Sequence, residues 1–477
     1  MTLIEEDITS IQLVERRPSM PKRVITDDSQ IESAPTTANN TPTLSRTNSN
    51  AHLAGSSTGV EFSLPPVDGG FNAWIVLISG FIIEGMVWGY PFSYSVYQQH
   101  YMKQPEFANA SVTELAIVGT LSTAVAYIGG FLVGLLGGRF SLKSMMYAGS
   151  LLMVVGLVAA SFATQAWHLM LTQGFVFGLG GSFAYNSLMM FIPMYFFKYR
   201  GIATGVIFAG AGVFGLISPQ LIDISLRTID WRWTLRVVAL FCLVLCLGSS
   251  FIIRPRYSPD AAARNRSTLN LKDFGFITSK RFLVMAGAVL FQGIGFFVPN
   301  LFIQLYYSAY ALYIGTSEQT STIILSILNA ASIFGQLALG HVCDRYGYSM
   351  SIIISSGVAS LSVFFLWGFA GNSFALLMTF VVIYGTFGSG FTSSFPSIVS
   401  DIAGTEYRKP ILINGVFMLL RGIGNVVGNP IGSLILTSAS RVSEAAGWHD
   451  MTYFVGSALI VSTICGTVRR FMPTRSS

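Results

Sequence analysis

The stretch Gly134-Leu-Leu-Gly-Gly-Arg139-Phe140 follows a long apolar run, and a related stretch returns 206 residues later. The second copy reads Gly340-His-Val-Cys-Asp344-Arg345-Tyr346-Gly347 and also follows an apolar run. Both copies place small residues and an arginine in a short loop. A loop that recurs in the same setting indicates that the chain repeats one structural unit.

Two further pairs support this repeat. Phe177-Gly-Leu-Gly-Gly181-Ser182 returns after 207 residues as Tyr384-Gly-Thr-Phe-Gly388-Ser389. Tyr199-Arg200 returns after 208 residues as Tyr407-Arg408. Because three pairs share nearly one offset, the sequence predicts two similar halves, the parallel repeat that is typical of major facilitator transporters.

Apolar runs of about 20 residues fill the chain from Ala73 onward, the length that a helix needs to cross roughly 30 Å of hydrocarbon. Pro219 and Pro299 fall inside two of them, which a membrane helix tolerates where neighbours satisfy the freed carbonyls. The predicted fold is therefore an all-α membrane protein with twelve transmembrane helices in two six-helix pseudo-symmetric bundles. The expected spans are 73–97, 115–137, 145–163, 169–192, 202–221, 234–253, 282–305, 319–342, 350–369, 374–395, 411–434 and 451–468.

The composition agrees with a membrane protein. Of 477 residues, 52% are hydrophobic and 10% are charged, whereas about 25% are charged in soluble domains. A soluble enzyme, a nucleic-acid-binding protein and a disordered scaffold are excluded for most of the chain, because so few polar groups could not cover its surface. The lipid bilayer is the first expected partner.

Charge placement predicts the orientation. With both termini in the cytoplasm, the inside segments carry 22 Lys and Arg and the outside loops carry 4. This asymmetry is a strong positive-inside signal, and omitting one helix would destroy it. The net charge of +6 thus indicates membrane topology rather than nucleic acid.

The ends and the middle of the chain differ from the apolar runs. Residues 1–66 are rich in Ser, Thr, Asn and Pro and are expected to form a disordered cytoplasmic tail. Arg16-Arg17-Pro18-Ser19 and Arg46-Thr47-Asn48-Ser49 in this tail are candidate kinase sites, with an unregulated tail as the alternative. The remaining segments expected are an N-terminal bundle (67–253), a basic cytoplasmic loop (254–281), a C-terminal bundle (282–468) and a short cytoplasmic tail (469–477).

Two further motifs carry a resemblance to a known family. Asp68-Gly-Gly-Phe-Asn-Ala-Trp74 leads into the first span, and Tyr195-Phe-Phe-Lys198-Tyr-Arg200-Gly-Ile-Ala-Thr-Gly205 leads into the fifth. Both resemble signatures of the monocarboxylate-porter family of the major facilitator superfamily, and the Ser/Thr-rich tail is similar to fungal members. The resemblance covers about 70–470 and implies a secondary transporter of small organic acids. Residues in motif positions are expected to hold the structure or gate it: Asp68, Trp74, Arg139, Lys198, Arg200, Asp344 and Arg345.

The chain also departs from animal members of that family. They carry a lysine after a proline in the first helix, where this chain has Phe92 after Pro91. They carry an Asp and an Arg in the eighth helix, where this chain has Ser332 and Gln336. Because those charges handle the proton and the carboxylate, the departures leave room for a larger, weakly charged substrate.

Two ionisable residues fall near mid-span, where a charge is costly and indicates function. Glu84 shares a helix face with Gly80 and Trp88 and is the candidate proton carrier; a structural carboxylate is the alternative. Arg421 carries a planar fork that matches a carboxylate or an enolate, so it is the candidate substrate anchor. The alternative for Arg421 is a structural partner for Glu84 or for helix-end carbonyls.

Polar residues in other spans complete the expected substrate site, with interhelical packing as the alternative for each. Asn329 and Gln336 share a face of the eighth span, and Asn300 lies beside Pro299. The resemblance adds cavity positions at Tyr127, Asn186, Thr392 and Ser393.

Enzyme chemistry is not expected. The five histidines are scattered without metal-ligand spacing, and no Gly-Lys-Ser/Thr phosphate loop is present. No cofactor is expected. The predicted function is alternating-access transport of a small organic acid or related metabolite, with protons as candidate coupling ions. The alternatives are import or efflux of a larger metabolite, riboflavin-like or secondary, and, more remotely, a substrate-sensing receptor. The expected location is the plasma membrane, with a vacuolar or other internal membrane as the alternative.

Overall fold

A computed structural model describes residues 68–137, 139–256, 271–314, 319–371, 373–404, 409–439 and 444–473. These residues belong to one compact unit, Ser63–Ser477. Within them the chain is helical and no strand is present. The predicted tail 1–66 and residues 257–270, half of the predicted loop 254–281, lie outside the described residues.

The helical elements of the first half end before the central loop. They are α1 (Phe71–Glu84), η1 (Gly85–Gly89), α2 (Tyr90–Phe92), α3 (Tyr94–Tyr101), η2 (Pro105–Phe107), α4 (Val112–Leu136), α5 (Leu142–Ala160), α6 (Ala166–Leu169), η3 (Met170–Val176), α7 (Phe177–Met189), α8 (Ile192–Tyr195), α9 (Arg200–Thr228), α10 (Trp231–Cys242), η4 (Leu243–Leu247) and α11 (Gly248–Ile252).

The second half begins with a short 3₁₀ segment. Its elements are η5 (Leu271–Thr278), α13 (Lys280–Ile314), α14 (Gln319–Tyr346), α15 (Tyr348–Leu361), η6 (Ser362–Trp367), α16 (Phe374–Ser389), η7 (Gly390–Ser394), α17 (Phe395–Ala403), α18 (Lys409–Ala439) and α19 (Glu444–Phe471).

The prediction of twelve spans is confirmed. The described residues contain 12 helices that are long and apolar enough to cross a membrane, six on each side of the central loop. The fifth expected span, 202–221, was too short, since α9 continues through Pro219 to Thr228. Side chains such as Phe251 and Phe365 are exposed on the outside of the helices, as expected where lipid rather than water surrounds a protein.

Local sequence explains where several helices begin and how they bend. Ser111 and Glu114 form a reciprocal capping box at the start of α4, and the Ser141 hydroxyl caps α5. Gly347 has a φ of 86° between α14 and α15, a conformation that glycine adopts without strain. The first span changes to a π-helical turn, η1, directly after Glu84, and such turns often occur at functional sites.

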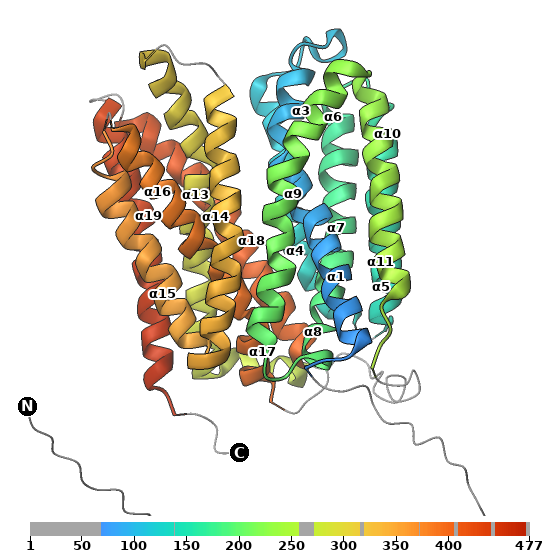
Figure 1. Ribbon diagram of the computed structural model, residues 1–477, viewed down its shortest axis with the longest axis vertical. Helices are drawn as coiled ribbons and strands as arrows, with labels where there is room; N and C mark the ends of the chain where they lie inside the picture. The colour runs from blue at the N-terminus through green and yellow to red at the C-terminus, as the bar shows by residue number, and fades with distance from the viewer. Residues whose placement is uncertain are drawn as a thin grey trace, which may run out of the picture. The chain divides into compact units, whose positions relative to one another are not determined.

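The two halves meet along two helix pairs, α9 with α14 and α4 with α18. Figure 1 shows α9, in green, beside α14, in yellow-orange, with α15, α16 and α19 to the left of α14 and α10 to the right of α9. One face of the molecule contains the start of α1 and the end of α19, and we call it the terminal face. The other, which contains the connection from α3 to α4, is called the opposite face. In Figure 1, α8 and α17 lie near the terminal face and α3 lies near the opposite face.

Candidate functional site

A cavity of about 320 Å³ lies between the two halves. Its lining runs from the middle of the helices, at Gln336 and Thr392, toward the opposite face, at Gln98 and Asn429. Nine large aromatic residues from both halves line it, namely Trp88, Phe92, Tyr94, Tyr127, Tyr185, Phe208, Phe296, Phe297 and Tyr384. This is the size and composition of a site for a small organic molecule.

Arg421 on α18 lines this cavity although its side chain is only 1% exposed. Its guanidinium carbon lies 5.4 Å and 5.5 Å from the rings of Phe296 and Phe297, and 5.7 Å from the ring of Tyr127. Phe395 completes this aromatic surround at 5.8 Å. Cation–π contacts at these distances stabilise a guanidinium that is largely removed from water.

Hydrogen bonds fix the direction of the Arg421 fork. Nη1 donates to Gln292 Oε1 at 2.5 Å, and Nε donates to the Tyr127 hydroxyl at 3.4 Å. The Gln292 amide in turn donates to the Gly388 carbonyl at 3.3 Å. In the part of the chain that the structure describes, no carboxylate forms an ion pair with Arg421. The guanidinium therefore keeps its full positive charge in the cavity.

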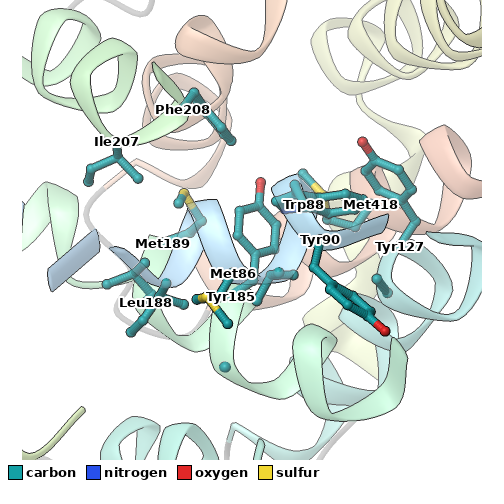
Figure 2. Packing of buried hydrophobic residues seen from close by; sticks show 14 of the residues in the cluster. Met86, Trp88, Tyr90, Tyr127, Tyr185, Leu188, Met189, Ile207, Phe208 and Met418 are labelled. Atoms are coloured by element: carbon teal, nitrogen blue, oxygen red, sulfur yellow. The ribbon is translucent and has the colours of Figure 1, made fainter. Parts of the chain in front are cut away.

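Glu84 ends α1 and also lines the cavity, with a side chain that is 2% exposed. Its Oε2 atom has no hydrogen-bond partner among the described residues. One turn further along, the Trp88 ring lies 4.3 Å from the Tyr127 ring and 5.5 Å from the Tyr185 ring. Figure 2 shows Trp88 beside Tyr127 and Met418. A path of aromatic rings thus leads from Glu84 in one half toward Arg421 in the other.

A wall of neutral polar groups comes from the second half. Gln336 Nε2 donates to the Ser389 carbonyl at 2.8 Å and to the Thr392 hydroxyl at 3.0 Å. Asn329 Nδ2 donates to the Gly215 carbonyl of α9 at 3.3 Å and so links the halves. All of these polar side chains line the cavity, and a ligand would exchange hydrogen bonds with them.

Three expected site residues do not contribute to the described lining. Asn186 is buried beside α4 and α18, where its oxygen accepts from Asn414 at 3.3 Å. The Ser393 hydroxyl turns back to the Gly390 carbonyl of its own turn at 2.7 Å. The side chain of Asn300 lies outside the described residues. The partners of Asn186 are the Ser182 carbonyl of its own helix and Asn414 of α18, and the partner of Ser393 is in its own turn, so both side chains take part in helix contacts.

Gln292 is the functional candidate that the sequence reasoning missed. It lies in the seventh span and is 1% exposed, yet it receives the shortest hydrogen bond from Arg421. Its only signal in the sequence is an amide within an apolar run. A search for mid-span charges passes over such a residue.

Asp68 organises the start of α9. Its carboxylate accepts backbone N–H groups of Phe197, Lys198 and Tyr199 at 2.7, 2.9 and 3.1 Å. Partial burial alone would raise the pKa of Asp68, but these three donors and the Arg200 charge together hold the pKa below its usual value.

This contact predicts a pH-dependent contribution to stability. Because the folded-state pKa of Asp68 is lowered, the stabilisation is present above the unfolded pKa of about 3.9 and is lost as the pH falls through the folded-state value. We expect Asp68→Asn to lower the melting temperature of the purified protein by about 2 °C at pH 7, and the difference to vanish in acid. Asp223→Asn is the matched control, since its pair with Arg227 is exposed. An equal shift for both variants would contradict this role.

Asp344 joins the two halves at the terminal face. Its carboxylate, on α14, accepts the backbone N–H groups of Gly201 and Ile202 in the first turn of α9 at 2.6 and 2.8 Å. A carboxylate is favoured at a helix N-terminus, where free N–H groups and the helix dipole both attract negative charge. This contact holds α9 against α14 in the conformation described.

Close backbone contacts accompany that carboxylate. A Cβ added at Gly340 would overlap the carbonyl oxygen of Gly201, and one added at Gly415 would lie 2.9 Å from the carbonyl oxygen of Gly130. The first contact joins α14 to α9 and the second joins α18 to α4. The halves are thus closed together on the terminal side of the cavity.

The other motif residues lie on the surface near this face. Arg200 Nε donates to the Phe196 carbonyl at 2.8 Å, and Lys198 lies over the Tyr199 ring. Arg345 lies over the Tyr346 ring. The remaining two, Trp74 and Arg139, are exposed.

Comparisons with known proteins agree with this architecture. The family model described as Major Facilitator Superfamily matches residues 76–408 and 303–476. A fujikurins efflux protein of Gibberella fujikuroi is 27% identical over 83% of this chain and 82% of its own length. An aspyridones efflux protein of Emericella nidulans is 26% identical over 83% of this chain and 77% of its own length.

Solved structures show the same fold. A proton:xylose symporter, XylE, aligns with a TM-score of 0.61 and 14% identity, covering 84% of this chain and 95% of its own. The human organic anion transporter TETRAN aligns with a TM-score of 0.61 and 11% identity, covering 82% of this chain and 99% of its own. These comparisons support the Major Facilitator Superfamily. Membership of the monocarboxylate-porter family, which the signatures suggested, stays a prediction.

Proposed function

The chain belongs to the Major Facilitator Superfamily, and from this premise we propose that it exports an aromatic organic acid through the cavity between its halves. As a transporter of this superfamily it is an integral, multi-pass membrane protein that moves small molecules. The observation that carries the proposed substrate class is Arg421, a full charge that aromatic rings surround and no described carboxylate neutralises.

The energetics of a buried guanidinium favour an anionic substrate. A charge at membrane depth costs at least about 2.5–3.5 kcal/mol on insertion scales, and arginine does not lose its proton in proteins. A carboxylate or enolate would offset that cost with two parallel charge-assisted hydrogen bonds. The aromatic walls would at the same time bury a flat apolar body.

The direction of transport is proposed from the relatives. The two relatives described above are named as efflux proteins, for fujikurins and for aspyridones. Both align over most of their length, and the cavity of about 320 Å³ accommodates more than a small monocarboxylate. Export of a metabolite is therefore favoured over uptake.

A second candidate is proton-linked movement of a small monocarboxylate. The Asp68 and Tyr195–Gly205 signatures favour it, because the monocarboxylate-porter resemblance rests on them. The neutral residues Ser332 and Gln336 in α14 weigh against it, since neither can hold an anion or a proton as charged residues would.

We place the terminal face in the cytoplasm on the distribution of Lys and Arg. The cavity would then face outward, and release of the Asp344 contact would open it inward. The two halves would rock around the central site as in other transporters of this architecture. The plasma membrane is the proposed location.

The direct test is transport by the purified full chain in proteoliposomes. Export is measured as uptake into vesicles in which the terminal face of the protein is on the outside. We expect these vesicles to take up aromatic acids from a panel faster than protein-free vesicles do. Running each compound with and without an imposed pH gradient shows whether protons are coupled. A panel in which neutral aromatic compounds move and acids do not would contradict an anion exporter.

Glu84 is the proposed proton carrier, because it is the acidic residue among the described residues that line the cavity. We expect Glu84→Gln to flatten the pH dependence of transport between pH 5 and 8, since an amide cannot bind and release a proton in that range. The measurement is the initial rate of transport at each pH. An unchanged pH profile in folded Glu84→Gln protein would remove this role.

A further inference from the structure

Buried polar atoms without a partner gather in the cavity. Among the described residues, three of these atoms belong to side chains that line it: Glu84 Oε2, Trp88 Nε1 and Asn429 Oδ1. Leaving such a group unpaired is costly, and more so when the group is charged. All three side chains belong to the cavity lining although these atoms are themselves buried. A ligand that reaches them is therefore a source of the missing hydrogen bonds.

The unpaired atoms have a definite chemistry. Glu84 Oε2 and Asn429 Oδ1 are acceptors, so each needs a donor from the ligand. Asn429 has already used its amide nitrogen on Asn425 Oδ1 at 3.0 Å. No ion pair to Glu84 is found within the described ranges. Arg421 does not serve as that partner, because its hydrogen bonds go to Gln292 and Tyr127.

The acceptor Glu84 and the cation Arg421 lie in different halves of the molecule. Glu84 comes from α1 and Arg421 from α18. Between them, the Trp88 ring lies 4.3 Å from the ring of Tyr127, whose hydroxyl accepts from Arg421. The separation is therefore spanned by aromatic rings, which matches a ligand with a flat body and a polar group at each end.

We propose that the ligand is amphoteric: an aromatic acid whose carboxylate binds Arg421 and whose nitrogen donates a hydrogen bond to Glu84. This inference rests on the proposed function and narrows its substrate class. A nitrogen donor satisfies Glu84, and the acid satisfies Arg421. Because each end contacts a different half, such a ligand ties the two halves together while it is bound.

A matched series of probes tests the nitrogen separately from the acid. Tryptophan, N-acetyltryptophan and indole-3-propionate share the ring and the carboxylate, but they carry an ammonium, an amide N–H and no side-chain nitrogen donor, respectively. Phenylalanine and 3-phenylpropionate repeat the comparison with a smaller ring. Binding to the purified full chain is measured by thermal shift and by isothermal titration.

We expect at least one probe with an ammonium or amide N–H on its side chain to bind about tenfold more tightly than its partner without one. The phenylalanine pair is decisive, because the ring N–H of the indole probes is itself a donor. Glu84→Gln should reduce this ratio to near one, and Glu84→Asp should restore part of it because the charge returns. Arg421→Gln should weaken both members of a pair to a similar extent. The second variant at position 84 keeps the test valid if the first does not fold.

The outcomes separate this inference from the proposed function. If nitrogen-free acids bind in an Arg421-dependent way with no advantage for the nitrogen, the amphoteric ligand is overturned and the anion exporter stands. A nitrogen advantage that survives in Glu84→Gln overturns the assignment of Glu84. If no probe of either kind binds, both the inference and the anion site are overturned.

Discussion

Arg421→Lys is expected to weaken binding of an aromatic acid more than tenfold while the protein still folds. Lysine keeps the positive charge but replaces the planar fork with a compact ammonium. It would lose the two-point contact with the acid and the bond from Nη1 to Gln292. A tenfold loss corresponds to about 1.4 kcal/mol, a modest part of what a charge-assisted pair contributes in a dry site.

The matched control for this prediction is Arg236→Lys. Arg236 also lies within a membrane span, but it contacts the Phe162 and Trp233 rings and the Ser161 hydroxyl away from the cavity. Its substitution should leave ligand affinity unchanged. Equal loss of folded protein for Arg421→Lys, without a specific loss of affinity, would assign Arg421 to structure instead.

Gln292→Glu tests the same site without touching Arg421. The new carboxylate would lie where Gln292 Oε1 accepts from Arg421 Nη1. It would form an ion pair with the guanidinium and offset its charge. Ligand acids should then lose their electrostatic attraction to the cavity. Retained acid binding in this variant would show that the Arg421 charge does not anchor the ligand.

Gly340→Val is expected to abolish transport by keeping the terminal face from closing. A Cβ at this position would overlap the Gly201 carbonyl oxygen and would lie 3.1 Å from the Ile202 Cα atom. These are backbone atoms, so no side-chain rotation relieves the clash. The two halves would separate at the terminal face, and the conformation in which the cavity reaches toward the opposite face would be lost.

Accessibility of a cavity position measures this change. Ser332→Cys, in a background without the native cysteines, introduces one thiol into the lining. A membrane-impermeant reagent should reach it from the opposite face in the parent and at least ten times faster from the terminal face in Gly340→Val. Gly248→Val is the control, because no atom lies within 4 Å of its added Cβ. Unchanged labelling from the terminal face would contradict the closing role of this contact.

Hydropathy was sufficient to predict the spans, since each apolar run long enough to cross a bilayer became a helix that crosses the unit. Helix ends were less accurate. α9 runs to Thr228, beyond the expected end at 221, because the helix packs against α14 and other helices along its length. Tertiary contacts of that kind are absent from a local pattern. The π-helical turn after Glu84 also has no signature in the sequence that periodicity can detect.

The cavity was predictable in part. Mid-span charge directed attention to Glu84 and Arg421, and both line the cavity. Gln292 was missed because an uncharged amide among apolar residues carries a weak signal. Asn186 shows the reverse case, since a polar side chain at a plausible depth bonds instead to Asn414 and its own helix. Which face a membrane helix turns inward depends on its partners.

The contact of Asp344 with α9 has a consequence for mutagenesis. Its carboxylate binds only main-chain amides, those of Gly201 and Ile202, and every residue except proline supplies such an amide. Alanine at either position would therefore leave both donors in place. Ile202→Ala would not report the contact, and Gly201→Ala would disturb it only through the overlap of its added Cβ with the Gly340 carbonyl oxygen. The two N–H donors that α9 contributes belong to the main chain, so no side-chain substitution other than proline removes them.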